Sequence, residues 1–559
     1  MPTLNWIGKQ AVVKHHKEVP FRLLEPVPEL SCGAADSGNL IVQGDNLHAL
    51  KALLPRYAGQ VKCIYIDPPY NTGNEGWAYN DNVNSPEIRK WLGEVVGKEG
   101  ETLDRHDRWL CMMYPRLLLL KQFLHEEGVI FVSIDDDEVH HLRELMDEIF
   151  GYKKRLTTFV WRTDGNFDNQ AKIKNCHEYV LAYAISPEKF AHPKVVDPSV
   201  GADSKLHKPF IRNTIVKNGI KNPVSPVTLP KGFPADFDSG TISARTNAWP
   251  KYATDIVVQD RKIMQATVGA SGWSSKDHLL EFIDNKFEPI LDTKGQKTRF
   301  VLTRTGAIES IKEREQASHV ISVIGGVGST QSQSVGLAEM GFSFPFPKPV
   351  DLIKYLLGMH SDSDGLVMDS FAGSGTTGHA VLKQNAEDGG NRHFILVEMD
   401  DNIARNVTTE RVRRVAQGYT NTKGLQVEGL GGGFQFCTLS KQPLFTYAGQ
   451  IRADVSFEEL SEFVWFTETG SGWLKSATRS PLLGTYKGTA IYLLYNGILK
   501  DRGDLGGNVL NSRTLAVLPK HDDARVIYGA RCRFDRSKLA RMGIEFRQLP
   551  YELTVKSWA

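Results

Sequence analysis

The sequence predicts an α/β fold built on a mostly parallel sheet with helices on both faces. Short apolar runs at residues 40–42, 63–66 and 129–134 are typical of buried strands. Apolar residues recur with helical spacing at residues 109–125 and 139–150. Because strands that alternate with helices form parallel sheets whose faces the helices cover, this pattern predicts the α/β class.

The composition is that of a soluble protein with several domains. With 559 residues, 41% of them hydrophobic, the chain is long enough for roughly two to four domains with well-packed cores. The net charge of +2 does not indicate a DNA partner, which would need a local basic surface. The sequence has neither a signal peptide nor a stretch of about 20 apolar residues, so we expect a cytoplasmic protein. The cysteines are too scattered for a zinc site or a disulfide framework: Cys32, Cys63, Cys111, Cys176, Cys437 and Cys532.

A carboxylate and an aromatic ring stand directly after one predicted strand. The apolar run 61–66 is followed by Asp67, Pro68, Pro69 and Tyr70. A base extruded from a duplex needs a ring to stack on and acceptors for its amino hydrogens. Tyr70 could supply the ring, Asp67 and the Pro68 carbonyl the acceptors, and the prolines a rigid backbone. The alternative is an ordinary proline turn, which the full tetrapeptide makes less favoured.

A glycine-rich turn follows another predicted strand far downstream. After the apolar run 366–369, Gly373, Gly375 and Gly378 have the G-x-G-x-x-G spacing at the start of an expected helix. Glu398 follows the next apolar run and is placed to hold ribose hydroxyls. Taken alone, this pattern also fits an enzyme that uses a nicotinamide dinucleotide. That alternative leaves the Asp-Pro-Pro-Tyr segment unexplained, because the segment has no role in hydride transfer.

Together, the two segments resemble the amino-group DNA methyltransferases that use S-adenosylmethionine. Those enzymes carry a D-P-P-Y turn for chemistry and a D-x-F-x-G-x-G turn for the cofactor. Here the chemistry turn comes first and a long insertion follows, which resembles the β class. The resemblance implies a Rossmann-like sheet in circularly permuted order. Supporting segments occur in the family's order at residues 44–47, 128–135, 177–181 and 346–349.

The resemblance also implies roles for single residues. Asp67, Pro68, Pro69 and Tyr70 would form the catalytic turn. S-adenosylmethionine would be bound by Asp369, Phe371, Gly373, Gly375, Thr376, Glu398 and Asp45. Asp45 is expected at the end of the strand next to the catalytic strand, close to the cofactor's adenine ring. Lys348 is a weaker candidate, because a surface lysine before a proline would explain it equally well.

Segments outside the two turns resemble the modification subunits of type III restriction systems. These segments are residues 356–414, 431–434 and 550–552. The resemblance implies N6 methylation of an adenine flipped out of double-stranded DNA, a homodimer, and a separate restriction subunit with helicase and nuclease activity. Cytosine C5 methylation is excluded, because no cysteine follows a proline. Cytosine N4 methylation stays open, although the resembled N4 enzymes usually carry Ser in place of Asp67, and so does a catalytically weak DNA-recognition subunit.

The expected domains follow from the change in character along the chain. They are an N-terminal extension (1–39), a catalytic half (40–185), an inserted target recognition domain (186–339), a cofactor half (340–420) and a C-terminal α+β domain (425–559). The insertion is rich in Pro, Asn, Ser and basic residues. As a set, its expected phosphate contacts are Lys205, Lys208, Arg212, Lys217, Lys221, Arg261 and Lys262.

Two further charged clusters have ordinary explanations. The acidic run 135–138, with His140 and His141 after it, suits the positive end of a helix, so we expect no metal site. A helix expected at residues 403–415 carries Arg411, Arg413 and Arg414 in its last turn. Those arginines fit either a solvated helix end or a DNA contact.

Overall fold

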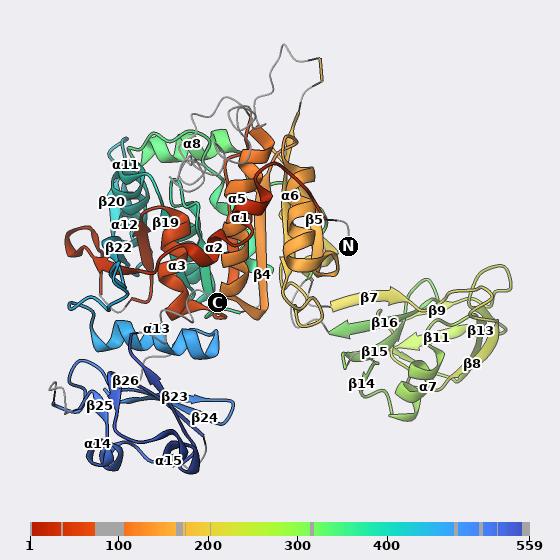
Figure 1. The fold of residues 1–559 in the computed structure, drawn as a ribbon. Coiled ribbons are helices and arrows are strands. Elements are labelled where there is room, and N and C mark those ends of the chain that lie inside the picture. Colours follow the sequence, from red (N-terminus) through yellow and green to blue (C-terminus); the bar gives the residue numbers. More distant parts are fainter. Residues whose placement is uncertain are drawn as a thin grey trace. The chain divides into compact units, whose positions relative to one another are not determined.

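The computed structural model describes residues 3–34, 37–72, 105–163, 172–173, 175–201, 203–208, 210–293, 295–313, 318–360, 362–473, 479–501, 507–521 and 524–550. The chain forms two compact units (Figure 1). One unit comprises Met1–His192 and Ile321–Ala559, and the other comprises Pro193–Val320. Among the described helices, none is long and apolar enough to span a membrane.

A large mixed sheet forms the centre of the first unit. In spatial order its ten described strands are β1 (Arg22–Pro26), β22 (Gln435–Pro443), β2 (Leu40–Gln43), β19 (His393–Glu398), β18 (Leu366–Asp369), β3 (Val61–Ile66), β4 (Leu124–Ile134), β6 (His177–Ala184), β5 (Arg155–Arg162) and β17 (Val323–Ile324). The strands from β22 to β4 are parallel. β6 is antiparallel to both of its neighbours, β4 and β5. These pairings confirm the expected α/β class, and they place the supporting segments 128–135 and 177–181 on β4 and β6, the two strands beyond β3.

Helices pack on both faces of this sheet. Up to residue 417, the first unit's described helical segments are α1 (Lys9–Val12), α2 (His15–Glu18), η1 (Pro28–Leu30), α3 (Asn46–Tyr57), α5 (Arg105–Phe123), α6 (Val139–Met146), η4 (Asp147–Gly151), η5 (Tyr152–Lys154), α8 (Thr330–Glu339), α9 (Val350–Gly358), α10 (Thr376–Asp388), α11 (Asp401–Ile403), η7 (Ala404–Thr408) and α12 (Thr409–Gln417). Ile64 and Ile395 join a core cluster with α3 and α5. Leu396, the next residue along β19, points to the other face and lies beneath Gly378 of α10.

The strand order shows the expected permutation. β18 and β19, which come late in the chain, lie between β2 and β3, which come early. β2 is therefore not the neighbour of β3, the strand that precedes Asp67, and the expectation that the strand before Asp45 lies next to it was wrong. The physical reason is that β2 pairs with β19 and β22 on its two sides, which leaves no free edge for β3.

The first unit extends beyond the expected core boundaries. β1 pairs with β22 at one edge of the main sheet, so part of the expected N-terminal extension belongs to it. β22 itself lies inside the expected C-terminal domain but pairs in parallel with β2. Residues 321–339, expected in the insertion, lie in the first unit, where β17 pairs with β5. In each case, backbone pairing to the large sheet sets the boundary.

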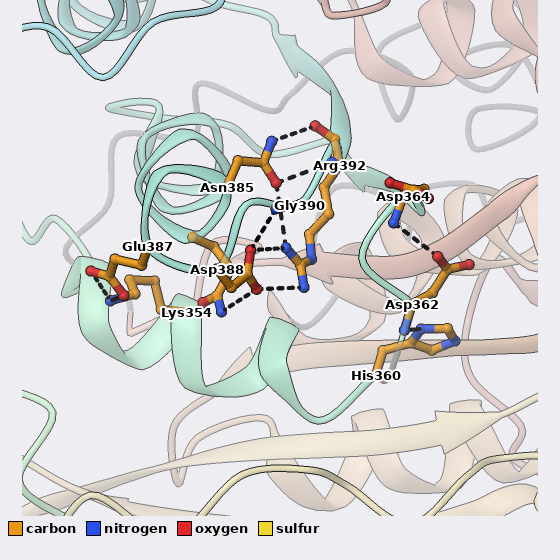
Figure 2. A network of polar contacts seen from close by, with 10 residues as sticks. Lys354, His360, Asp362, Asp364, Asn385, Glu387, Asp388, Gly390 and Arg392 are labelled. Carbon is orange, nitrogen blue, oxygen red and sulfur yellow. Dashed lines mark hydrogen bonds and ion pairs between the residues drawn. The ribbon is translucent and has the colours of Figure 1, made fainter. Parts of the chain in front are cut away.

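The turn between α10 and β19 is held by a polar network (Figure 2). Gly389 ends α10 with φ of 70°. The side chain of Asn385 donates to the Arg392 carbonyl at 2.9 Å and accepts from the Arg392 amide at 3.0 Å. Arg392 also pairs with Asp388 at 2.9 Å. This network starts β19 at a fixed place, so that Glu398 stands at the strand's carboxyl end.

A smaller α/β module follows the main sheet in the first unit. Its elements are α13 (Phe457–Thr469), β23 (Leu482–Tyr486), β24 (Thr489–Leu493), β25 (Val509–Leu510), α14 (Ser512–Val517), β26 (Arg525–Gly529), β27 (Arg531–Cys532), α15 (Arg536–Arg541) and β28 (Ile544–Gln548). β23, β24, β26 and β28 form one sheet in that order. A short hairpin of β20 (Gly418–Thr420) and β21 (Gln426–Glu428) precedes the module.

The second unit is built mainly from short antiparallel strands. Its elements are η6 (Lys205–His207), β7 (Phe210–Thr214), β8 (Ser225–Leu229), β9 (Gly240–Ile242), β10 (Lys251–Tyr252), β11 (Ile256–Gln259), β12 (Lys262–Ile263), β13 (Thr267–Ser271), α7 (Lys276–Asp284), β14 (Ile290–Leu291), β15 (Lys297–Leu302) and β16 (Ile308–Glu313). Phe233, Phe282 and Phe300 are buried in its core. With its own core, this unit is a separate folded body.

Candidate active site

The carboxyl ends of β3 and β18 meet at one edge of the main sheet and border a shared cavity. Because neighbouring parallel strands end on the same side, the segments that follow them lie close together. The cavity has a volume of about 600 Å³. It is lined by Tyr65, Asp67, Pro68, Pro69, Tyr70, Thr72, Glu178, Thr330, Phe344, Pro345, Phe346, Pro347, Lys348, Asp369, Phe371, Ala372, Gly373, Ser374, Thr376 and Thr377. The two segments identified in the sequence thus contribute to one site.

The turn after β3 is held by contacts from β6 and α5. The Tyr70 hydroxyl lies 2.9 Å from Asp67 Oδ1 and 2.8 Å from Glu178 Oε2, so it can donate to either carboxylate. Trp109 of α5 donates from Nε1 to the Pro69 carbonyl at 2.7 Å. Burial, followed by the charges of Asp67 and Glu178, raises the pKa of Tyr70 well above its ordinary value. Tyr70 is therefore a neutral donor at the wall of the cavity.

Lys348 is a buried cation in this site, not a surface lysine. Only 7% of its side chain is exposed, and its Nζ lies 3.0 Å from Asp67 Oδ2 and 3.4 Å from Glu178 Oε2. The ammonium also lies 4.7 Å from the centre of the Tyr70 ring. Burial acts to lower the pKa of Lys348, but the charges of Asp67 and Glu178 outweigh it and raise that pKa. Lys348 therefore stays charged and holds two acids from different strands together.

The glycine turn needs backbone conformations that glycine adopts at little cost. Gly373 has φ of 49° and Gly375 has φ of 78°, and Gly375 stands at the N-cap of α10. Asp369 accepts hydrogen bonds from the Phe371 amide at 3.0 Å and from Thr377 Oγ1 at 2.5 Å. These contacts fold the chain sharply back after β18 and bring the turn's backbone to the cavity wall.

Two buried carboxylates lie at this turn. Glu398 accepts from the Gly373 amide at 2.8 Å and from the Asp400 amide at 2.9 Å. Burial raises the pKa of Glu398 to about 7, although these amide hydrogen bonds oppose the shift. Burial likewise raises the pKa of Asp369 to about 7, against the hydrogen bonds from Thr377 and Phe371. A cationic ligand close to these acids would favour their ionised forms.

Arg411 supports the glycine turn from behind, a role that the sequence analysis missed. Its side chain is fully buried, and Nη1 donates to the Ser374 carbonyl, to Ser374 Oγ and to Thr376 Oγ1 at 3.1, 2.7 and 2.9 Å. Burial lowers the pKa of Arg411 to about 9. From the sequence, we expected either a solvated helix end or a DNA contact. Neither holds for Arg411, because its side chain is fully buried. The helix turns Arg411 inward, and only the tertiary contact reveals it.

Asp45 is not among the residues that line the shared cavity. It caps α3 by accepting from the His48 amide at 2.8 Å, and its Oδ2 lies 3.4 Å from Arg116 Nη2. The neighbouring Asn46 is buried and donates to the Ser370 carbonyl at 3.3 Å. A role of Asp45 in binding a cofactor remains a prediction, and its contacts here are the cap of α3 and the ion pair with Arg116.

The expected phosphate contacts lie in the second unit. The exposed members of the set are Lys208, Arg212, Lys217, Lys221, Arg261 and Lys262, whereas the side chain of Lys205 lies outside the described residues. Arg212 forms ion pairs with Asp236 at 2.6 Å and with Glu309 at 2.8 Å. Arg261 lies 4.0 Å from Asp238. Arg212 is thus already neutralised by two acids, which makes it the least suited of the set to bind a phosphate.

The residues around the glycine turn fit S-adenosylmethionine. The backbone at Gly373 is close-packed, since an added Cβ would lie 3.2 Å from the Phe344 ring. Asp369 lines the cavity and is 2% exposed. Together with Glu398, it places potential negative charge beside a cavity that also has aromatic walls from Phe371 and Phe344. This combination suits a ligand with a cationic sulfur and a flat ring.

Comparison with known proteins assigns the chain to a family. The profile of a DNA methylase family matches residues 61–409. The Mod subunit of the type III restriction-modification enzyme EcoPI from Escherichia phage P1 is 31% identical over 468 residues, which cover 75% of this chain and 69% of that protein. The corresponding StyLTI subunit from Salmonella typhimurium is 30% identical over 451 residues, covering 74% of this chain and 62% of that protein.

The alignments to the Mod subunits are incomplete on both sides. The chain spans between 62% and 69% of the length of the StyLTI and EcoPI subunits. Among solved structures, the cytosine-N4-specific PvuII DNA methyltransferase is 11% identical with a TM-score of 0.30, covering 67% of this chain and 90% of that one. A score this low carries no argument about substrate. The match of the family profile to residues 61–409 and the 31% identity to the EcoPI Mod subunit show that the chain belongs to the DNA methylase family.

Proposed function

We propose that this protein transfers a methyl group from S-adenosylmethionine to the N6 amino group of adenine in a short DNA sequence. The observation that carries the proposal is the shared cavity, in which the turn after β3 and the glycine turn after β18 line one space. A methyl donor held at one turn and a base held at the other would meet inside it. The similarity to Mod subunits supports the same reaction.

The chain's own residues account for activation of the base. An adenine amino nitrogen is a poor nucleophile because its lone pair is delocalised into the ring. Asp67 and the Pro68 carbonyl would accept the two amino hydrogens and localise the lone pair, while Tyr70 stacks on the flipped base. When bound, S-adenosylmethionine supplies the electrophilic methyl group. The proton released from nitrogen passes to Asp67 or to water.

The Tyr70 hydroxyl has two acceptors, and this favours entry of a base. Asp67 Oδ1 lies within hydrogen-bond distance of Tyr70, so an incoming amino group needs that oxygen to be released. Glu178 lies equally close to the hydroxyl and can take over as its acceptor. Lys348 meanwhile keeps Asp67 Oδ2 in place. Asp67 can thus exchange one hydrogen bond for another without leaving the site.

Adenine is the better-supported base, with cytosine as the second candidate. The family includes methylases of both N6 and N4 amino groups. The resembled N4 enzymes usually carry Ser where this chain has Asp67. A carboxylate is the stronger acceptor for an amino hydrogen, and Asp67 therefore supports N6 methylation.

The assembly we propose follows the type III systems. The protein would act in the cytoplasm as the modification and recognition subunit, as a homodimer, with helicase and nuclease activities on a separate polypeptide. The second unit would read double-stranded DNA, with phosphate contacts from the exposed residues Lys208, Lys217, Lys221 and Lys262. Among the described residues, none of these four lysines has an acidic partner like those of Arg212. Light scattering with and without DNA tests the dimer.

Mapping of modified bases tests the reaction, the base and the site together. The protein is expressed in a methylation-deficient bacterial host, and the genome is read by single-molecule sequencing. We expect N6-methyladenine in one short recurring motif. Methylcytosine in such a motif would favour N4 chemistry. An unmodified genome, combined with measurable cofactor binding, would favour a catalytically weak recognition subunit.

Replacing Lys348 by methionine is expected to slow methylation. Without the ammonium, Asp67 and Glu178 lose the cation that they share, and the Asp67 carboxylate is no longer held in place at the cavity wall. The single-turnover methylation rate should therefore fall about tenfold or more. Lys383→Met is the matched control, because Lys383 pairs with Asp351 on the surface at 2.9 Å. A wild-type rate in Lys348→Met would contradict this role.

A further inference from the structure

A second buried polar cluster lies behind the turn that follows β3. At its centre is Glu138, at the N-cap of α6, which is 0% exposed. Asn71 donates from Nδ2 to Glu138 Oε1 at 2.5 Å. His106 Nδ1 lies 2.6 Å from Oε1, and His141 Nδ1 lies 2.8 Å from Oε2. Both oxygens of a fully buried carboxylate are thus hydrogen-bonded, as burial of such a group requires.

The cluster is connected to the cavity through one residue. Asn71 follows Tyr70 directly, is 3% exposed and has φ of 63°. A left-handed backbone in a residue other than glycine costs about 1 kcal/mol or more and persists only where its surroundings hold it. Glu138 is a fixed hydrogen-bond partner for the Asn71 side chain. Their hydrogen bond therefore stabilises the chain reversal that leaves Tyr70 at the cavity wall.

The cluster shares a helix with another support of the same turn. His106 and Trp109 lie three residues apart on α5, and residues with that spacing share one helix face. Trp109 donates to the Pro69 carbonyl, whereas His106 contacts Glu138. One face of α5 thus supports the turn directly through Trp109 and indirectly through His106, Glu138 and Asn71.

We infer that Glu138 is a positioning residue for methyl transfer. Glu138 is not among the residues that line the cavity, and it acts by fixing Asn71 and, through Asn71, the ring of Tyr70. His106 and His141 in turn fix the orientation of the carboxylate. This inference rests on the proposed function for its effect on rate, but its effect on the turn is a property of the protein without substrate.

The same three side chains have donor atoms that a transition metal could use. The donor atoms of His106, Glu138 and His141 all lie within 4.8 Å of one another. From the acidic run 135–138 with His140 and His141, we expected no metal site. The structure brings His141 and His106, and not His140, to the Glu138 carboxylate. The observed N–O distances are those of hydrogen bonds. They are shorter than the separation of two donor atoms around tetrahedral zinc, about 3.3 Å for bonds of the usual length. His106 and His141 therefore contact Glu138 through hydrogen bonds.

A reciprocal exchange of donor and acceptor tests the inference. In Asn71→Asp two carboxylates face each other, and we expect the single-turnover methylation rate to fall about a hundredfold. In the double variant Asn71→Asp with Glu138→Gln, the amide donates to the new carboxylate, so most of that loss should be recovered. Affinity for S-adenosylmethionine, measured by calorimetry, should change little in either. Glu144→Gln, an exposed acid on the same helix α6, is the matched control and should behave as wild type.

A second measurement does not depend on methylation. Hydrogen exchange at the Tyr70 and Asn71 amides is followed by mass spectrometry. It should be faster in Asn71→Asp than in the wild type, and it should return toward the wild-type rate in the double variant. If the wild type methylates no DNA but this exchange pattern holds, the proposed function fails and the positioning of the turn stands. A double variant as slow in methylation as Asn71→Asp would overturn the inference. So would a stoichiometric metal in the purified wild type that Glu138→Gln loses.

Discussion

Replacing Asp67 by alanine is expected to lower the methylation rate by about a thousandfold or more while S-adenosylmethionine still binds. The carboxylate is the proposed acceptor of the adenine amino hydrogen and of the released proton, and such groups contribute about a hundredfold to ten-thousandfold. The glycine turn is held by Asp369, Glu398 and Arg411, none of which is hydrogen-bonded to Asp67. Rates are measured in single turnovers on a DNA carrying the mapped motif, and cofactor affinity by calorimetry.

Two comparisons make the Asp67 result specific. Asp364→Ala removes an exposed acid near the amino end of β18, at the far end of the strand from the cavity, and should methylate at the wild-type rate. Asp67→Asn keeps the size of the side chain and one acceptor oxygen but loses the charge that pairs with Lys348. We expect it to lie between wild type and alanine. Wild-type rates in Asp67→Ala would remove Asp67 from the catalytic assignment.

Replacing Arg411 by methionine is expected to weaken cofactor binding about tenfold or more, equivalent to at least about 1.4 kcal/mol. The substitution removes the donor that fixes both Ser374 and Thr376 at the glycine turn. Global stability should change less than cofactor affinity. Methionine fills most of the space that the arginine side chain occupies. Among the described residues the buried guanidinium has no carboxylate partner, so its removal also ends the burial of an unpaired charge. Calorimetry gives the affinity and thermal unfolding the stability.

Arg413 on the same helix is the matched control for Arg411. It pairs with Glu410 and donates to the Leu30 carbonyl at 2.9 Å, away from the glycine turn. Arg413→Met should therefore leave cofactor affinity unchanged. Equal affinity losses in the two variants would mean that helix α12, and not the contact of Arg411 with the turn, is what matters for the cofactor.

The local features of the site could be predicted from sequence because neighbouring residues determine them. An apolar strand followed by Asp67 and two prolines dictates a rigid turn at a strand end, and the spacing of Gly373 and Gly375 dictates a tight turn before a helix. The α/β class, the permuted strand order and the family were likewise predicted and are confirmed. The strand before Asp45 was expected next to the strand before Asp67, and this was wrong, because it pairs with β19 and β22. Strand pairing joins segments that are distant in the sequence, so local patterns do not determine it.

The sequence by itself determined which segments meet at the shared cavity, and only the tertiary structure decided which charged residues support them. Lys348 and Arg411 both read as surface cations, because lysine and arginine are rarely buried and no local pattern marks the exceptions. Lys348 is buried because Asp67 and Glu178, distant in sequence, meet it with opposite charge. Arg411 is buried because the backbone and hydroxyls of the glycine turn accept its hydrogen bonds. Burial of a charge depends on partners that only folding brings together.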